Sequence, residues 1–104
     1  MIEIQNKEEL KNLIESNEYV IVDFWAPWCS PCRALIPLLE KLSEEYKNIT
    51  FCKVNVDSNS ELSVDYKITS IPHVFFIKNG VEFSNFRGLK QKKEIIKLIE
   101  TFFN

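Results

Sequence analysis

Hydrophobic residues recur along the chain at two spacings, and each spacing predicts a different kind of element. Runs of β-branched and aromatic residues cover 19–26 and 49–56, which is typical of strands buried on both faces of a sheet. A shorter run at 2–4 predicts an edge strand. Between the two long strands, apolar residues at helical spacing predict a helix over 31–47. Strands therefore alternate with helices, which predicts an α/β protein.

Polar residues with cap chemistry predict where two further helices begin. Asn6, with Glu9 three residues later, forms a capping signal ahead of an apolar pattern. Ser58 and Glu61 repeat that spacing and predict a short helix through about Tyr66. A closing helix is indicated by apolar residues that share one side: Ile95, Ile96, Ile99, Phe102 and Phe103.

The last third of the chain changes to a hairpin pattern. Apolar runs at 74–77 and 81–86 flank the Asn-Gly pair at 79–80, which is the strongest short-range signal for a β-hairpin. The apolar phase slips between Phe83 and Phe86, so a bulge is expected there. The complete prediction is β-α-β-α-β-α-β-β-α, a mixed sheet with helices on both faces.

Composition and charge limit the class of protein. With 104 residues, 45% of them hydrophobic, and no repeat or linker, we expect one domain over residues 1–104. A net charge of −2 without a concentrated basic face argues against a nucleic-acid partner. Asp23 and Lys78 interrupt the two longest apolar runs, so no membrane span is expected. Because the first residues lack a signal-peptide pattern, we expect a cytoplasmic protein.

The candidate chemistry lies in the stretch WAPWCSPCRALIP, residues 25–37, where a predicted strand ends and a helix begins. A helix N-terminus presents unpaired N–H groups and a partial positive charge, which stabilise a thiolate. Cys29 directly precedes the helix and is therefore the candidate nucleophile. Cys32 lies one turn further on the same side, close enough for a disulfide. Pro31 suits the first helical turn, where no N–H is needed.

A metal clamp and a structural staple are alternatives to redox chemistry for this cysteine pair. Zinc needs about four ligands, and the soft candidates in the chain are Cys29, Cys32, Cys52 and His73. The ligand count therefore disfavours a metal site, and we expect none. A disulfide across so short a loop constrains the unfolded chain very little, which disfavours a purely structural role.

Several separate features together resemble the thioredoxin family. They are WCSPC at the end of a strand, Asp23 six residues before the first cysteine, Pro37 five residues after the second, and Ile71-Pro72 ahead of the Asn-Gly hairpin. The resemblance covers essentially the whole chain. It implies the thioredoxin fold, a mixed five-stranded sheet flanked by four α-helices.

The same resemblance implies a protein-disulfide reductase. The Cys29 thiolate would attack a substrate disulfide, and Cys32 would resolve the mixed disulfide, leaving an oxidised Cys29–Cys32 pair. The expected partners are disulfide-containing protein substrates and a thioredoxin reductase, commonly a flavoprotein that uses NADPH. No metal or organic cofactor is expected, and the protein is expected to be a monomer.

Supporting roles for other residues also follow from the resemblance. Asp23 matches a buried aspartate that relays the proton of Cys32, and Lys53 matches the lysine that faces it. From the residues alone, Asp23 also fits an ion-paired core carboxylate. The residues expected to form the substrate surface are Trp28, Ser30, Pro31, Ile71, Pro72, Arg87 and Gly88. Of these, Ile71-Pro72 matches a cis-proline that offers backbone hydrogen bonds to a substrate, and Trp28 a surface-facing indole.

The sequence departs from the family pattern at a few positions. Ser30 replaces a glycine, and a hydrogen bond from its hydroxyl to the Cys29 thiolate would make the protein more oxidising. Arg87 replaces a small aliphatic residue and predicts a preference for acidic partners. Lys67 and Ser70 also replace glycines.

Two alternative functions remain beside the reductase. One is a disulfide oxidant or isomerase that works outside the cytosol, and the other is a non-catalytic binding module that uses the same docking face. Cys52 and His73 are expected to be structural, Cys52 as a small buried hydrophobe and His73 in the core or at the surface.

Overall fold

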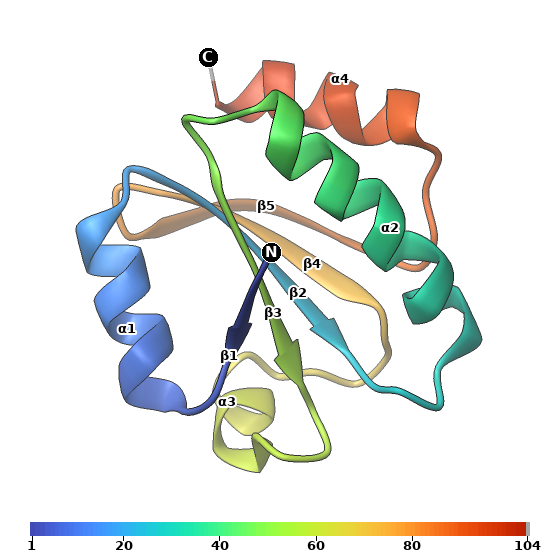
Figure 1. The fold of residues 1–104 in the computed structure, drawn as a ribbon. Helices are drawn as coiled ribbons and strands as arrows, with labels where there is room; N and C mark the ends of the chain where they lie inside the picture. The colour runs from blue at the N-terminus through green and yellow to red at the C-terminus, as the bar shows by residue number, and fades with distance from the viewer. Residues whose placement is uncertain (104) are drawn as a thin grey trace.

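The computed structural model describes residues 1–103. In this part of the chain the predicted order of strands and helices is confirmed (Figure 1). The strands are β1 (Ile2–Ile4), β2 (Tyr19–Trp25), β3 (Thr50–Asn55), β4 (His73–Lys78) and β5 (Val81–Arg87). The helices are α1 (Lys7–Ser16), α2 (Ser30–Glu45), α3 (Ser60–Asp65) and α4 (Lys92–Phe102).

The five strands of residues 1–103 form one mixed sheet in the order β1-β3-β2-β4-β5. β1 and β2 pair with β3 in parallel, whereas β4 pairs antiparallel with both β2 and β5. β2 lies in the middle, and 20–24 are fully buried. The position of β2 explains why its sequence is apolar without alternation. β1 lies at an edge, as predicted.

Helices cover both faces of the sheet, α2 and α4 on one and α1 and α3 on the other (Figure 1). Alternate strand residues therefore enter different cores. Ile21, Phe51 and Val74 pack with α2 and α4. Val22, Cys52 and Phe75 belong to the core with α1 and α3. The two cores hold the C-terminal end of β2 and the start of α2 in fixed positions.

One of the two predicted helix caps is confirmed and the other is wrong. The side chain of Asn6 accepts a hydrogen bond from the backbone N–H of Glu9 at 2.9 Å, as the sequence predicts. The short helix α3 instead has Asn59 at its cap position, without a side-chain cap bond. The reason lies in the preceding turn, where Ser58 and Asn59 both donate to the carbonyl of Asn55.

The hairpin between β4 and β5 has the predicted turn and bulge. Asn79 and Gly80 both have positive φ, 52° and 79°, which is the backbone of a type I′ turn. The register passes from Phe76 opposite Ser84 to Ile77 opposite Glu82, so Phe83 is the extra residue on β5. None of the helices within residues 1–103 is both long and apolar enough to cross a membrane.

Candidate active site

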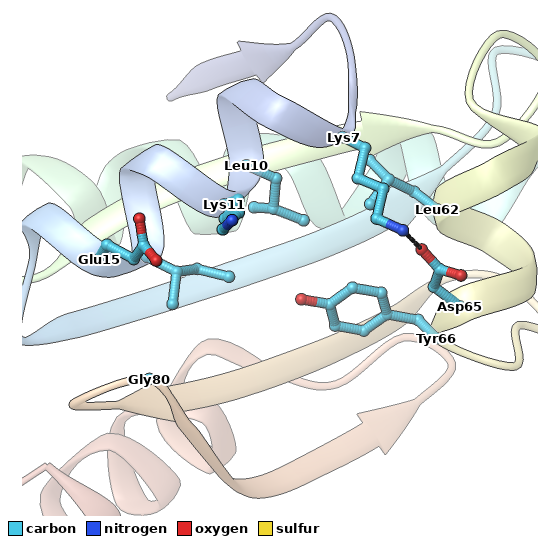
Figure 2. A pocket seen from close by; sticks show the side chains of 9 residues that line it. Lys7, Leu10, Lys11, Glu15, Leu62, Asp65, Tyr66 and Gly80 are labelled. Atoms are coloured by element: carbon cyan, nitrogen blue, oxygen red, sulfur yellow. Dashed lines mark ion pairs between the residues drawn. The ribbon is translucent and has the colours of Figure 1, made fainter.

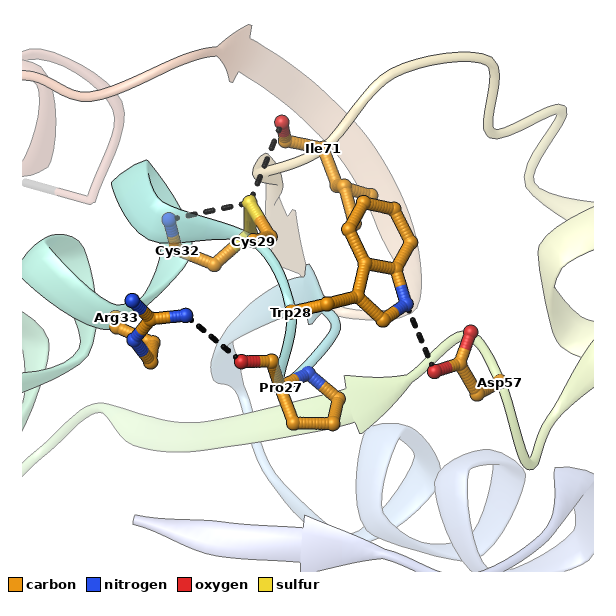
Figure 3. The surroundings of a disulfide bond; sticks show 7 residues. All are labelled: Pro27, Trp28, Cys29, Cys32, Arg33, Asp57 and Ile71. Atoms are coloured by element: carbon orange, nitrogen blue, oxygen red, sulfur yellow. Dashed lines mark hydrogen bonds between the residues drawn. A yellow bond between two sulfur atoms is a disulfide. The ribbon is translucent and has the colours of Figure 1, made fainter.

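The two predicted cysteines lie at the start of α2 and are joined in a disulfide, with their Cα atoms 5.2 Å apart (Figure 3). Cys29 is the N-cap residue of α2, in an extended backbone conformation. Its sulfur accepts a hydrogen bond from the backbone N–H of Cys32 at 3.2 Å. The sulfur of Cys29 therefore occupies the place that a capping oxygen takes in other helices.

This position favours negative charge on Cys29 in the reduced protein. A thiolate at the same place receives the N–H of Cys32 and the partial positive charge of the helix N-terminus. Cys29 keeps 5% of its surface exposed, whereas Cys32 is completely buried. An incoming disulfide therefore reaches the sulfur of Cys29 first, which supports Cys29 as the nucleophile and Cys32 as the resolving cysteine.

The Ile71-Pro72 segment lies beside the disulfide, as the sequence resemblance predicted. The peptide bond between the two residues is cis, and the carbonyl oxygen of Ile71 lies 3.8 Å from the sulfur of Cys29. The carbonyl of Pro72 accepts a hydrogen bond from the N–H of Gly88 at 2.9 Å. The carbonyl of Pro72 is therefore already used within the protein, whereas the backbone of Ile71 faces the sulfur of Cys29.

Trp28 is a surface residue next to the cysteines. Two thirds of its surface, 67%, is exposed, and its indole Nε1 donates to Oδ2 of Asp57 at 2.9 Å (Figure 3). Asp57 was missed by the sequence reasoning. Its position in the loop after β3 could have indicated this contact. The carboxyl ends of the parallel strands β2 and β3 lie at the same edge of the sheet, so the loops that follow them are neighbours. The hydrogen bond to Asp57 fixes the indole beside the disulfide.

Arg33 is a second residue that the sequence reasoning missed. Its guanidinium Nη1 donates to the backbone carbonyl of Pro27 at 2.9 Å (Figure 3). This bond ties the loop before Cys29 to the first turn of α2. Arg33 also places a positive charge near the helix start.

Asp23 is a fully buried carboxyl group on β2, on the sheet face that α2 and α4 cover. Within residues 1–103 neither carboxyl oxygen has a hydrogen-bond partner. Burial raises the pKa of Asp23 to about 7, and the charge of Lys53 opposes that rise. A carboxyl group that titrates near neutral pH can both give and accept a proton.

Lys53 is the direct neighbour of Asp23 on β3, as predicted, but its ammonium is engaged elsewhere. Its Nζ lies 4.7 Å from the centre of the Trp25 ring and 3.9 Å from Oε1 of Glu3. No ion pair with Asp23 is present in the described residues. The prediction that Lys53 lies beside Asp23 is thus confirmed by the register, and Glu3 is a partner that the sequence reasoning missed.

The remaining predicted surface residues lie at the start of α2 and at the end of β5. Ser30 and Pro31 form the exposed first turn of α2. In the described part of the chain the Ser30 hydroxyl makes no hydrogen bond in this oxidised state. Arg87 is exposed at the end of β5, opposite His73, and Gly88 follows with a φ of 83°. Gly88 is linked to the cysteines through its bond to Pro72.

Two hollows differ in their relation to these residues. One of 540 Å³ lies between α3 and the cis-proline segment, and its lining includes Trp28, Val56, Val64, Ile68 and Ile71. The other, of 370 Å³, lies between α1 and α3, where Lys7 and Asp65 form an ion pair of 2.8 Å (Figure 2). The second hollow contains none of the predicted site residues.

Cys52 and His73 lie apart from the disulfide in separate surroundings. Cys52 is a free, fully buried thiol in the core under α1 and α3, and burial raises its pKa. His73 is buried, stacks on Phe75 and shares a hydrogen bond of 2.9 Å with Asn85. Among residues 1–103, no three His, Cys, Asp or Glu side chains gather as a metal-binding group.

Comparison with known proteins agrees with this geometry. The thioredoxin family model matches residues 1–101. The chain is 41% identical over 100 residues to a thioredoxin of Mycoplasmoides gallisepticum, covering 96% of this chain and all of the relative. It is 40% identical over 99 residues to a thioredoxin of Chlamydia pneumoniae, covering 95% and 96% of the two chains.

Solved structures show the same fold. A thioredoxin of Plasmodium falciparum superposes with a TM-score of 0.91 at 35% identity, covering 98% of this chain and 99% of the other. A mutant thioredoxin of Halobacterium salinarum gives a TM-score of 0.93 at 29% identity, covering 99% and 90%. The predicted thioredoxin fold is therefore confirmed. Together with the Cys29–Cys32 pair, these matches establish a thiol–disulfide oxidoreductase, and the chain belongs to the thioredoxin family.

Proposed function

We propose that this oxidoreductase works as a reductant of protein disulfides in the cytoplasm, as a monomer that is recharged by a thioredoxin reductase. The observation that carries the proposal is the placement of Cys29, partly accessible at a helix N-terminus, above the fully buried Cys32. The free Cys52 thiol is also in keeping with a reducing compartment. The cysteine pair itself carries the electrons, and no metal or organic cofactor is needed.

The reaction has two exchange steps. The Cys29 thiolate attacks one sulfur of a substrate disulfide, which forms a Cys29–substrate disulfide and releases the other substrate sulfur as a thiolate. Cys32 then loses its proton and attacks the sulfur of Cys29, which releases the second substrate thiolate. The substrate gains two electrons, and the protein keeps the Cys29–Cys32 disulfide that the structure contains.

Asp23 is the proposed acceptor of the Cys32 proton, and Lys53 is its charge partner. Both lie on the sheet face that α2 covers, and a carboxyl group with a pKa of about 7 is matched to proton transfer at neutral pH. Because its oxygens have no other hydrogen-bond partner among residues 1–103, the carboxyl group is free to accept this proton.

The proposed substrate surface joins the exposed Trp28 to the Ile71-Pro72 segment and the hollow beside it. An extended peptide that pairs with the backbone of Ile71 brings its disulfide onto Cys29. Arg87 is exposed directly before Gly88, which bonds to Pro72, and its charge favours substrates with acidic residues near their disulfide. Replacing Arg87 by valine should reduce both the preference for acidic peptides and the salt dependence of their reduction.

A redox titration in graded dithiol buffers tests the proposed direction, with the fluorescence of Trp25 and Trp28 as the signal. A two-electron midpoint near −270 mV, a value typical of thioredoxin, supports a reductant. A midpoint of about −180 mV or higher would instead indicate an oxidant or isomerase. Turnover with NADPH and a thioredoxin reductase then tests the recharging partner, with the Cys29→Ser, Cys32→Ser double variant as the inactive control.

A further inference from the structure

Three charged side chains lie in one row across the sheet. Glu3 on β1 is in register with Lys53 on β3, and Lys53 is in register with Asp23 on β2. Residues in direct register on neighbouring strands point to the same face, which here is the face covered by α2 and α4. The order along the row is carboxyl, ammonium, carboxyl, so Lys53 stands between two carboxyl groups.

The two ends of the row are in different surroundings. Glu3 is 42% exposed and forms the ion pair with Lys53, at 3.9 Å. Asp23 is fully buried and forms none within residues 1–103. The side chain of Lys53 is only 18% exposed, and its ammonium lies over the ring of Trp25 with Glu3 on the β1 side.

Few other charges face Asp23. The titratable groups on the neighbouring strands are Glu3 of β1, Lys53 and Cys52 of β3, His73 and Lys78 of β4, and Glu82 and Arg87 of β5, and α2 adds the Cys29–Cys32 pair. The remaining charged side chains of α2 and α4 are exposed or partly exposed. Cys52 is on the opposite sheet face, in the core with α1 and α3, and the direct partner of Asp23 on β4 is the uncharged Val74. Lys53 is the charge that acts on Asp23, and Glu3 is the charge that acts on Lys53.

We propose that Glu3 is a positioning residue of the exchange reaction: it competes with Asp23 for the charge of Lys53, and so sets the pH range over which the buried carboxyl group takes the proton of Cys32. Glu3 acts on Asp23 in two ways, through its ion pair with Lys53 and through its own negative charge. This inference rests on the proposed role of Asp23 in the resolving step.

The direction of the effect follows from charge alone. Removing the negative charge of Glu3 leaves Lys53 to a single carboxyl group and takes away a negative charge two strands, about 10 Å, from Asp23. Both changes favour the ionised form of Asp23. A unit charge at that distance shifts a pKa by about half a unit to one unit at the effective dielectric constants of protein surfaces.

The test uses the full-length reduced protein and its Glu3→Gln variant. Carboxyl carbon NMR follows the ionisation of Asp23, and stopped-flow fluorescence follows the reduction of a peptide disulfide from pH 5 to 9. We expect the Asp23 midpoint to fall by about half a unit to one unit, and the rate at pH 6 to rise about two- to fivefold because more Asp23 is ionised. Glu15→Gln, the same change on the exposed surface of α1, is the matched control and should change neither.

Two further variants separate the possible failures. Lys53→Met should reduce the Asp23 midpoint shift caused by Glu3→Gln in a double-mutant cycle, and the shift that remains measures the direct effect of the Glu3 charge. An Asp23 midpoint that stays within about 0.2 units, or that rises, in Glu3→Gln overturns the proposal. If the midpoint falls as expected but neither Glu3→Gln nor Asp23→Asn changes the pH dependence of the rate, then the proposed proton transfer to Asp23 is wrong, and Glu3 has no part in the reaction.

Discussion

The molecule holds cysteines in two opposite environments. Cys29 caps a helix, receives a backbone N–H and keeps part of its surface exposed. Cys52 lies in the middle of β3 with no exposed surface, and burial raises its pKa. Both are the same amino acid within one small fold. A thiol at the start of a helix, where backbone donors lack partners, is therefore reactive, whereas a thiol in the middle of a buried strand is inert.

Replacing Cys29, the reactive cysteine, should have the largest effect on the rate of disulfide reduction. Cys29→Ser should lower the rate of protein-disulfide reduction by about three orders of magnitude or more, because no nucleophile remains. Cys32→Ser should keep the first attack and stop at a mixed disulfide on Cys29. Mass spectrometry of the trapped adduct identifies the modified residue, and an adduct on Cys52 would reverse the assignment.

Asp23 also affects the buried cysteine: its charge raises the pKa of Cys52, although burial has the larger effect. Its own folded-state pKa, about 7, lies above its ordinary value of 3.8. The folded protein therefore binds a proton more tightly than the unfolded chain, and stability falls as the pH rises from about 4 to 7. Above that window the buried charge costs about 4 kcal/mol.

Asp23→Asn removes this cost. The variant should be more stable than the parent by about 4 kcal/mol at pH 8 and no more stable below pH 4. Urea unfolding at both pH values measures the difference. A gain that is independent of pH would show that the carboxyl group is not buried as a charge. The same variant should also slow the resolution of the mixed disulfide near pH 7.

Ser30→Gly tests whether the Ser30 hydroxyl stabilises the Cys29 thiolate in the reduced protein. A hydroxyl that donates to the thiolate stabilises the reduced state by about 1.5–3 kcal/mol. Removing it should make the redox midpoint more negative by about 30–60 mV at most. Equilibration with dithiol buffers measures the shift. An unchanged midpoint would mean that the Ser30 hydroxyl stays in solvent in the reduced protein, as it does in the oxidised one.

Cys52→Val replaces the buried, inert cysteine and should have the smallest effect. Valine is of similar size and apolar, so the core under α1 and α3 should lose about 1 kcal/mol or less. The rate of disulfide reduction and the redox midpoint should not change. Urea unfolding and the same peptide assay measure both quantities, and a change in the midpoint would assign Cys52 a redox role that its position does not support.

The sequence predicts the fold well because its signals are local and agree with one another. The Asn79-Gly80 turn, the Asn6 cap and the apolar β2 each follow from a few neighbouring residues. The spacing of Ser58 and Glu61 predicts the wrong cap for α3. The side chains of Ser58 and Asn59 instead donate hydrogen bonds to the carbonyl of Asn55, which the spacing does not reveal.

At the site, the pairing of Cys29 with Cys32 follows from spacing, but the residues around the pair follow only in part. Asp57, in the loop after β3, contacts Trp28, and Glu3 on β1 contacts Lys53 on β3; both contacts depend on how the strands pair in the sheet. A register is set by the packing of the whole domain, which no short motif contains.

Site-resolved alkylation of the reduced, folded protein compares the reactivity of Cys29 and Cys52 directly. Iodoacetamide is added at pH 7 and stopped at intervals, and peptide mass spectrometry follows each cysteine. We predict that Cys29 reacts at least about 100-fold faster than Cys52, which is modified only after unfolding in urea. Comparable rates for Cys29 and Cys52 in the folded protein would contradict the account.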